Sequence, residues 1–344
     1  MVLDSHVHMV DTYEPLQTMI QKIHKGLSNC GFDKWCFAIN PSEGIHAVHL
    51  NLLAFLFKLK YPESTYVFAG LDYHIPGTNF NNFEFGFQAK QMLDIGIEGY
   101  KMYEGKPNAR RICGNIPLTD RKYSGFFELM NQKKMPVAIH LGDPPEFWDY
   151  TKLEAYQGSK GWFFGDMTFA PWQEIFDEFF TLISLYRDIP FIIPQFGYLF
   201  PDLEKMSALL DTHPNLHFDI APAGDNYDFI KKNPGVYRSF VERYPEKLIL
   251  ACTGVCTNWS DGAIKAKKIL DSLYMLDLPP SILDKILSRN FLSLCKPQLV
   301  NIPALAKYAA FVGQHVEVYS VVPGYRKVVN RTLEVIDAIE AIAN

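Results

Sequence analysis

The chain has no large excess of charge of either sign and no long apolar run. Its 33 Lys and Arg residues face 38 Asp and Glu residues, which leaves a formal net charge of −5. This balance gives no electrostatic reason to expect nucleic acid or an anionic membrane as a partner. The apolar runs are too short to span a bilayer, and the N-terminus lacks the basic and apolar regions of a signal peptide. We therefore expect a cytoplasmic protein whose partner is a small molecule.

Cysteine is scarce and scattered. The six cysteines lack the paired spacing of a metal finger, and Cys252 with Cys256 supplies only two of the four ligands that a structural zinc site needs. We predict free thiols that are mostly buried. A glycine-rich phosphate turn is also missing after the first predicted strand, where residues 9–12 read Met-Val-Asp-Thr. This argues against an open, doubly wound nucleotide-binding sheet.

The chain does contain a regular alternation of short apolar segments and helical segments. Hydrophobic residues make up 48% of the chain and aromatic residues 14%, as expected for a protein with a large core. The apolar segments are continuous rather than alternating, which is typical of parallel strands buried on both faces. The predicted strands are residues 2–9, 34–39, 65–71, 97–103, 135–140, 189–194, 215–220 and 247–252. The segments between them include a predicted helix over residues 13–28, a loop over residues 104–119 and a single helix over residues 227–243.

A parallel barrel of this kind closes with eight strand–helix units, and the sequence contains eight. We therefore predict an α/β protein with a (β/α)8 TIM barrel over residues 1–298 and extra C-terminal helices over residues 299–344. The last helices have amphipathic spacing, so we expect them to pack on the outside of the barrel or on a second subunit. A homo-oligomer is thus an open alternative.

The opening strand carries two histidines on one face. Side chains alternate along a strand, so His6 and His8 project to the same side and can reach one point. Two such imidazoles suit a transition metal such as zinc, iron or nickel. The alternative is a polar edge strand whose histidines happen to alternate.

A third histidine closes the fifth predicted strand. In a barrel, functional groups gather at the C-terminal ends of the strands, and His140 occupies such an end. Together with His6 and His8 it makes three protein ligands, which suffice for a catalytic zinc with an open position. The alternative for His140 is a histidine satisfied within the core.

Lys101 ends the fourth strand and points to the same mouth, where its ammonium could neutralise a substrate carboxylate. The alternative is a buried lysine paired with Glu98 or Glu104. Tyr103 follows it at the same strand end and is a candidate substrate contact.

Further candidate substrate contacts lie in two long loops. Arg110 and Arg111 could grip a carboxylate through paired N–H groups, although a solvated loop accounts for at least one of them. Residues 143–171 form an aromatic insertion that includes Trp148. This insertion could be a lid over an apolar substrate or an oligomer contact.

At this point the sequence resembles a known family, the amidohydrolase-related (amidohydrolase 2) proteins, in the branch similar to aminocarboxymuconate-semialdehyde decarboxylase. The resemblance implies a (β/α)8 barrel, hydrolase or decarboxylase chemistry, and one divalent metal, most often zinc. It implies His6, His8 and His140 as metal ligands. The motifs that carry it span residues 1–295 and are Asp4-Ser-His-Val-His8, Gly96-Ile-Glu-Gly-Tyr-Lys101, Pro136-Val-Ala-Ile-His140-Leu-Gly-Asp143-Pro, Phe191-Ile-Ile-Pro-Gln195-Phe-Gly197, His213-Pro-Asn-Leu-His-Phe-Asp219-Ile and Arg289-Asn290-Phe.

The sequence departs from the family pattern twice. Where the family has His-x-Gly after the sixth strand, this chain has Gln195, which can hydrogen-bond water or substrate but cannot shuttle a proton. Where the family has an aspartate that binds metal and acts as base, this chain has Gly254. Substitute carboxylates are conceivable at Asp143, Asp225 and Asp261.

The sequence therefore predicts a metal-dependent hydrolase that acts on a small carboxylated substrate, such as a lactone or amide, through metal-activated water. Its predicted catalytic residues are Gln195, Asp143 and Lys101. The alternatives are a degenerate barrel that binds a ligand without turnover, a decarboxylase, and a metal-free lactonase-like enzyme.

Overall fold

The computed structural model describes residues 1–40, 45–73, 84–153, 163–200, 202–221, 226–321 and 323–343. Asp225, one of the candidate substitute carboxylates, lies outside these residues. Within the described part of the chain, no helix is both long and apolar enough to cross a membrane.

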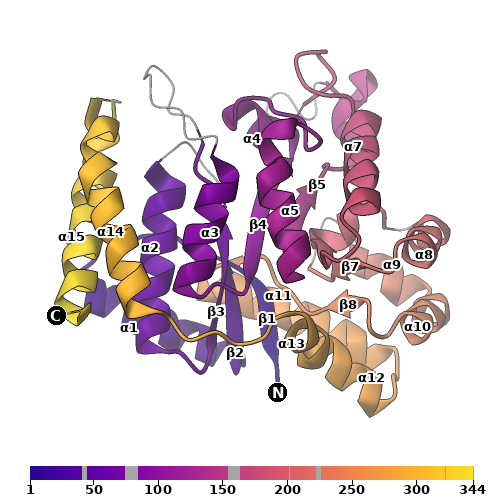
Figure 1. Cartoon of the computed structure of the whole chain (residues 1–344). Coiled ribbons are helices and arrows are strands. Elements are labelled where there is room, and N and C mark those ends of the chain that lie inside the picture. The colour runs from indigo at the N-terminus through magenta and orange to yellow at the C-terminus, as the bar shows by residue number, and fades with distance from the viewer. Residues whose placement is uncertain are drawn as a thin grey trace.

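The strands form one parallel sheet that curls into a barrel (Figure 1). Neighbouring strands follow chain order from β1 to β8, as βαβ units require. All eight predicted strands are present, which confirms the predicted α/β barrel class. The strands are β1 (Leu3–His8), β2 (Lys34–Ala38), β3 (Thr65–Gly70), β4 (Gly99–Gly105), β5 (Val137–Leu141), β6 (Phe191–Ile193), β7 (Leu216–Asp219), β8 (Leu248–Ile249) and β9 (Gly254–Val255).

The last two strands are halves of one element that closes the barrel. β8 pairs with β7, whereas β9 pairs with β1, so residues 248–255 bridge the first and last strands of the sheet. Between the halves, the Ser5 amide donates to the Leu250 carbonyl at 3.1 Å. Thr253 interrupts the ladder with a positive φ of 48°. The eighth strand is therefore kinked at its mouth end.

Helices cover the outside of the barrel (Figure 1). Helix α1 buries Met19, Ile20 and Ile23 at helical spacing, as the sequence predicts. The principal helices are α1 (Leu16–Asn29), α2 (Ile45–Lys60), α3 (Phe85–Ile95), α4 (Pro107–Ile112), α5 (Ser124–Lys133), α7 (Trp172–Leu185), α8 (Leu203–Thr212), α9 (Asn226–Lys232), α10 (Pro234–Arg243), α11 (Trp259–Met275), α12 (Pro280–Asp284), α13 (Asn290–Leu294), α14 (Ile302–His315) and α15 (Arg326–Ala343).

Two local expectations are wrong. The single helix predicted over residues 227–243 is two helices, because Pro234 has no N–H to continue the first and instead opens α10. The segment predicted as a loop over residues 104–119 contains α4, which Pro107 opens in the same way.

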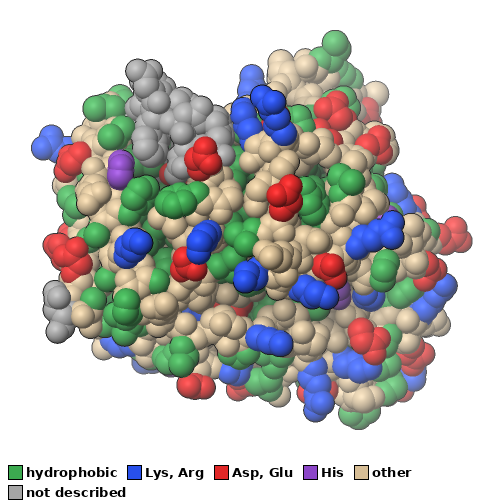
Figure 2. Space-filling view, in the orientation of Figure 1, with side chains coloured by type: hydrophobic (Ala, Val, Ile, Leu, Met, Phe, Trp, Pro, Cys, Tyr) green, Lys and Arg blue, Asp and Glu red, His purple; other side chains and the backbone are tan. Residues whose placement is uncertain are grey.

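The barrel strands and most of the cysteines are buried, as the sequence predicts. Strands β3 and β5 are buried at every position, and five of the six cysteines are buried. Acidic and basic side chains are interspersed over the face shown in Figure 2 rather than segregated by sign.

The C-terminal helices pack against α2 and α3 on the outside of the barrel (Figure 1). A buried polar cluster attaches α15 to the loop that follows β1. The Asp11 carboxylate accepts from Arg331 Nε at 2.8 Å and pairs with His49 Nε2 at 3.0 Å. Thr332 Oγ1 lies 3.2 Å from the other ring nitrogen of His49. This cluster links α15, α2 and the segment three residues beyond His8.

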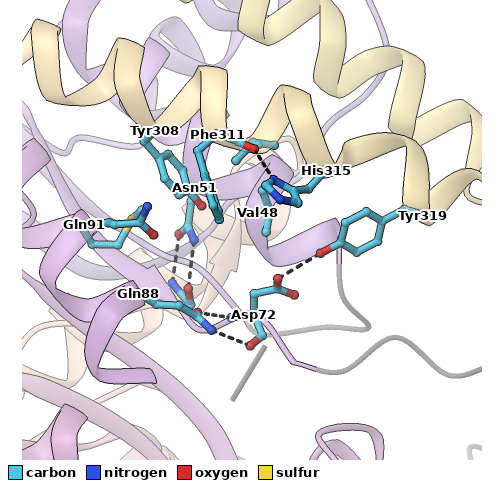
Figure 3. A pocket seen from close by; sticks show the side chains of 12 residues that line it. Val48, Asn51, Asp72, Gln88, Gln91, Tyr308, Phe311, His315 and Tyr319 are labelled. Carbon is cyan, nitrogen blue, oxygen red and sulfur yellow. Dashed lines mark hydrogen bonds between the residues drawn. The ribbon is translucent and has the colours of Figure 1, made fainter. Parts of the chain in front are cut away.

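A second attachment lies at the end of β3, where the Tyr319 hydroxyl donates to Asp72 at 3.0 Å (Figure 3). The amides of Asn51 and Gln88 hold the backbone of Gly70 and Asp72, each by two hydrogen bonds. The cavity between these side chains has a volume of about 30 Å³. This volume has room for about two water molecules.

The hydrogen bonds to Asp11 should make the free energy of unfolding fall in acid. Burial alone would raise the pKa of Asp11, but hydrogen bonds from His49 and Arg331 outweigh it and lower the pKa to about 2. A depressed carboxyl pKa stabilises the fold above the unfolded pKa near 3.8, and that contribution disappears as pH falls through the folded pKa. We expect a loss of about 2 kcal/mol between pH 4 and pH 2.

Urea unfolding followed across this pH range measures the effect, with Asp11→Asn as the matched variant. The variant starts less stable and has a flatter profile below pH 4. If both proteins lose stability in parallel over this range, other carboxylates are responsible.

Candidate active site

The first strand brings His6 and His8 together at the barrel mouth. Their ring centroids are 4.8 Å apart and nearly perpendicular. The Nδ1 atom of His6 lies 2.8 Å from Asp219 Oδ2, and burial lowers the pKa of His6, helped by the charge of Lys101. The neutral ring therefore donates Nδ1–H to Asp219. Its Nε2 lone pair is buried and has no hydrogen-bond partner among the described residues.

His8 is held differently. Asn40 Nδ2 lies 3.1 Å from His8 Nδ1 and donates to it, which puts the single proton of the neutral ring on Nε2. Burial lowers the pKa of His8 well below its usual value, and His6 and Lys101 act in the same direction. The free edge of His8 is thus an N–H donor, in contrast to the lone pair of His6.

His140 closes β5 beside Tyr103, with 4.8 Å between the ring centroids. Its Nε2 lies 3.4 Å from Asp143 Oδ1, and burial lowers its pKa to about 4 despite that carboxylate. Asp143 also accepts two hydrogen bonds of 2.7 Å from Lys106. Burial opposes ionisation of Asp143, but His140 and Lys106 lower its pKa below the usual value. Asp143 is therefore an ion-paired carboxylate rather than an unoccupied base.

Lys101 is a buried lysine whose ammonium has no hydrogen-bonded counter-ion among the described residues. Its side chain has no exposed surface, and its Nζ has no hydrogen-bond acceptor among the described residues. The partners that the sequence suggested are otherwise engaged: Glu98 pairs with Lys58, and Glu104 accepts from the Tyr103 amide. Burial lowers the pKa of Lys101 to about 7, although Asp219 acts in the opposite direction.

The positive charge of Lys101 lowers the pKa of His6, of His8 and of His140. Its Nζ also lies 5.6 Å from the centre of the Tyr103 ring. The structure thus gathers Lys101 and Tyr103 with the three predicted histidines around one mouth.

Asp219, which the sequence analysis named within a family motif without giving it a catalytic role, organises this mouth through hydrogen bonds. Its Oδ1 accepts from the Gln195 amide at 2.6 Å and from the Ala221 amide at 3.1 Å, while Oδ2 holds His6. A carboxylate that fixes the tautomer of a functional histidine is a common supporting arrangement. Its place at the end of β7 was the available signal.

Gln195 lies at the mouth in a left-handed conformation, with φ 58° and ψ 38°. Its side-chain oxygen accepts from the Tyr198 hydroxyl. The side chain is thus positioned by a neighbour, and it has no proton-transfer capacity of its own. Its catalytic role remains a prediction.

Asp4 supports the same mouth from below. Its Oδ1 accepts from the His6 and Cys252 amides at 3.0 Å each, which ties β1 to the eighth strand. Burial raises the pKa of Asp4 to about 7 against these two hydrogen bonds.

The predicted substrate contacts Arg110, Arg111 and Trp148 contact residues outside the set of histidines at the mouth. Both terminal nitrogens of Arg110 bind Glu178 on α7 at 2.9 Å, so its guanidinium is already paired. Arg111 is exposed and stacks over Phe169. Trp148 donates to the Ala170 carbonyl and packs on Phe164 within the aromatic insertion. We carry none of these three into the proposed chemistry.

The register of the eighth strand sets Gly254 and Val255 on different sides of the sheet. In β9, Gly254 is in register with Val7 and Val255 with His8. A Cβ at Gly254 would face Gly262 in α11, outside the barrel, at 3.7 Å. Registered neighbours in parallel strands point to the same side, so Val255 faces the mouth with His8. The kink at Thr253 causes this shift of one residue.

This register predicts that aspartate at position 255 affects Zn²⁺ binding and that aspartate at position 254 does not. Val255→Asp places a carboxylate beside His8, and we expect it to tighten Zn²⁺ binding by about a factor of ten. Gly254→Asp points away from the mouth and leaves the affinity unchanged. Calorimetric titration of the two variants measures the difference, and a stronger effect at Gly254 would contradict the register.

The described residues do not contain a group of three His, Cys, Asp or Glu side chains spaced to hold a metal ion. Among the residues that the structure describes, only His6 directs a buried lone pair at the mouth without a partner, whereas His8 and His140 are engaged through Asn40 and Asp143. A catalytic zinc takes three protein ligands. The residues present therefore do not fit the expected metal in this arrangement, and we derive no step through one.

Comparisons with known proteins agree with the fold. No family model and no curated protein sequence matches the chain. Among solved structures, a TIM-barrel protein of Bordetella bronchiseptica matches 85% of this chain and 97% of its own, at 11% identity and a TM-score of 0.54. A protein described as amidohydrolase II matches 86% and 99%, at 16% identity and 0.57. The 5-carboxyvanillate decarboxylase of Sphingomonas paucimobilis matches 86% and 99%, at 10% identity and 0.52.

These identities are low enough that the likeness shows the fold alone. The chain has the barrel found in proteins named as amidohydrolase and decarboxylase.

Proposed function

We propose that this chain is an enzyme that acts on a small carboxylated substrate at the barrel mouth, and that its reaction is decarboxylation. The observation that carries the proposal is the ammonium of Lys101, which is buried with no acceptor among the described residues. An unpaired buried cation is costly, and an anionic ligand would offset that cost.

Decarboxylation suits the groups at this mouth better than hydrolysis does. Hydrolysis needs a base that takes a proton from water. Asp143 is paired with Lys106, Asp219 holds His6, and Gln195 cannot accept a proton for transfer. Loss of carbon dioxide requires no such base. It requires a cation near the developing carbanion and a proton donor to replace the departing carboxyl group.

Lys101 can supply both functions from one position. Its ammonium attracts the anionic substrate into a site with little water. The carbon–carbon bond to the carboxylate then breaks, its electron pair stays on the substrate carbon, and carbon dioxide leaves. A proton moves from Lys101 Nζ to that carbon, and solvent reprotonates the amine. The pKa of about 7 supports this donor role near neutral pH.

The solved decarboxylase of the same fold is named for an aromatic carboxylate, which supports testing this substrate class. Wild-type protein incubated with 5-carboxyvanillate and related aromatic carboxylates should release carbon dioxide, measured with a coupled assay. Lys90→Met is the control for Lys101→Met, because Lys90 lies on the exposed face of α3 and pairs with Asp94 at the surface. Lack of release from every aromatic and aliphatic oxo-carboxylate tested would count against the proposal.

Metal-dependent hydrolysis of a lactone or amide is the second candidate. The unpartnered Nε2 of His6 is the observation that favours it, because a nitrogen lone pair of this kind is a metal ligand. The sequence expects zinc on His6, His8 and His140, so this candidate requires the three side chains to rearrange from the positions described above. Hydrolysis without release of carbon dioxide, dependent on added Zn²⁺, would support this candidate over the first.

A further inference from the structure

The chain is left-handed for four successive residues directly after β6, at the mouth of the barrel. Gln195, Phe196, Gly197 and Tyr198 have φ angles of 58°, 53°, 61° and 53°. Residues with a side chain usually adopt this conformation singly, because their Cβ crowds the following carbonyl oxygen. A run that includes three such residues is therefore strained. Strain of this kind clusters at binding and catalytic sites, where the surrounding structure holds it in place.

The left-handed turn brings two polar side chains onto one face. In an extended strand, residues 195 and 198 would point to opposite sides of the sheet, because side chains alternate. In a tight helical turn, residues i and i+3 lie above one another. The Tyr198 hydroxyl therefore reaches the Gln195 side chain and donates to its Oε1. The backbone N–H of Gln195 donates to Asp219 Oδ1 at 2.6 Å, which holds the start of the turn.

Ring contacts connect this turn with Lys101. The ring centroids of Tyr198 and His140 are 5.8 Å apart, and those of His140 and Tyr103 are 4.8 Å apart. The Nζ atom of Lys101 lies 5.6 Å from the centre of the Tyr103 ring. The turn and the buried ammonium are therefore parts of one contiguous set of side chains at the mouth.

The hydrogen bond from Tyr198 leaves one end of the Gln195 amide available to a ligand. The amide oxygen is the acceptor for Tyr198, whereas the amide nitrogen donates to none of the described residues. The Gln195 side chain is partly exposed. It can therefore present an NH2 group, which is a hydrogen-bond donor and suits a carboxylate or carbonyl oxygen.

We propose that Tyr198 is a positioning residue that directs the NH2 group of Gln195 to an oxygen atom of the carboxylated substrate. The hydroxyl acts through the glutamine and does not itself contact the reacting atoms. This inference rests on the substrate class of the proposed function, but it does not depend on the reaction that follows binding.

Binding of benzoate to the full-length protein, measured by calorimetry, tests the inference without turnover. Tyr198→Phe removes one oxygen atom and should weaken binding about threefold to tenfold, and Gln195→Met should weaken it about tenfold. The double variant should bind as well as Gln195→Met alone, because the hydroxyl has no effect without the amide. Tyr274→Phe is the matched control, since Tyr274 is largely exposed on α11, and it should bind like wild type.

Gln195→Glu supplies a second test that does not depend on Tyr198→Phe being folded. Glutamate keeps an acceptor for Tyr198 but replaces the donor with a carboxylate. It should weaken the binding of benzoate more than Gln195→Met does, and it should weaken the binding of neutral benzamide less, so the ratio of the two affinities falls. A purely structural role of residue 195 would leave this ratio unchanged. Circular dichroism reports on the folding of each variant.

Three results would overturn the inference: no binding of benzoate by wild type, additive losses in the double variant, or equal affinities in Tyr198→Phe and Tyr274→Phe. Carbon dioxide release is measured separately. Coupled losses of benzoate affinity without release of carbon dioxide from any carboxylate would reject the proposed reaction and leave this inference standing.

Discussion

Replacing Lys101 with methionine should lower kcat/KM for the carboxylated substrate by about a hundredfold to a thousandfold. Loss of one preorganised group that stabilises developing charge costs this much in enzymes. Lys101 is the cation available to both the substrate and the developing carbanion, since the neighbouring Lys106 is held by Asp143. The loss should appear mainly in kcat, because stabilisation and protonation of the carbanion take place after the substrate has bound.

The same substitution should make the protein more stable. The ammonium is fully buried and has no acceptor among the described residues, so an apolar side chain of similar length removes a desolvation penalty. We expect a gain of about 1–3 kcal/mol in urea unfolding. A residue that lowers stability while supporting turnover is typical of an active site. A loss of both stability and activity in Lys101→Met would instead identify Lys101 as a structural residue.

Replacing Arg331 with methionine should cost about 3 kcal/mol of the free energy of unfolding. The guanidinium is buried, binds both oxygens of Asp11 and also donates to the Glu14 carbonyl. Its removal leaves the Asp11 carboxylate buried with fewer donors and releases α15 from the loop after β1. The variant should therefore also be less rigid in the segment that follows His8.

Urea unfolding measures the loss, and hydrogen exchange of the segment from Met9 to Glu14 measures the local effect. Glu334→Gln is the matched control, because Glu334 also binds Arg331 but is largely exposed. It should cost less than about 0.5 kcal/mol. Equal losses in the two variants, or unchanged exchange after β1, would show that α15 does not support this loop.

The barrel could be predicted because its signals are local. Buried parallel strands are continuous apolar runs, and each is followed by helical spacing, so all eight strands were found from the sequence. The His6 and His8 pair was predictable for the same reason, since strand alternation places them on one face.

The partners of the charged residues could not be predicted. Arg110 binds Glu178, which is 68 residues away, and Lys106 binds Asp143, which is 37 residues away. No sequence spacing encodes such pairs, because they depend on how helices and loops pack around the finished barrel. The same limit applied to Lys101, for which the sequence left two partners open.

The eighth strand shows how one residue of register changes a site. The sequence suggested Gly254 as the place of the missing carboxylate, whereas the pairing with β1 puts Val255 beside His8. The cause is the left-handed Thr253, and threonine gives no warning of it because such a conformation is rare for a β-branched residue.

A crystal structure of the protein with a small aromatic carboxylate bound tests the account most directly. We predict that a carboxylate oxygen lies about 3 Å from Lys101 Nζ, with His8 Nε2 as a second donor. A carboxylate bound elsewhere, with Lys101 Nζ turned to Asp219, would contradict the claim that this lysine is the substrate-facing cation.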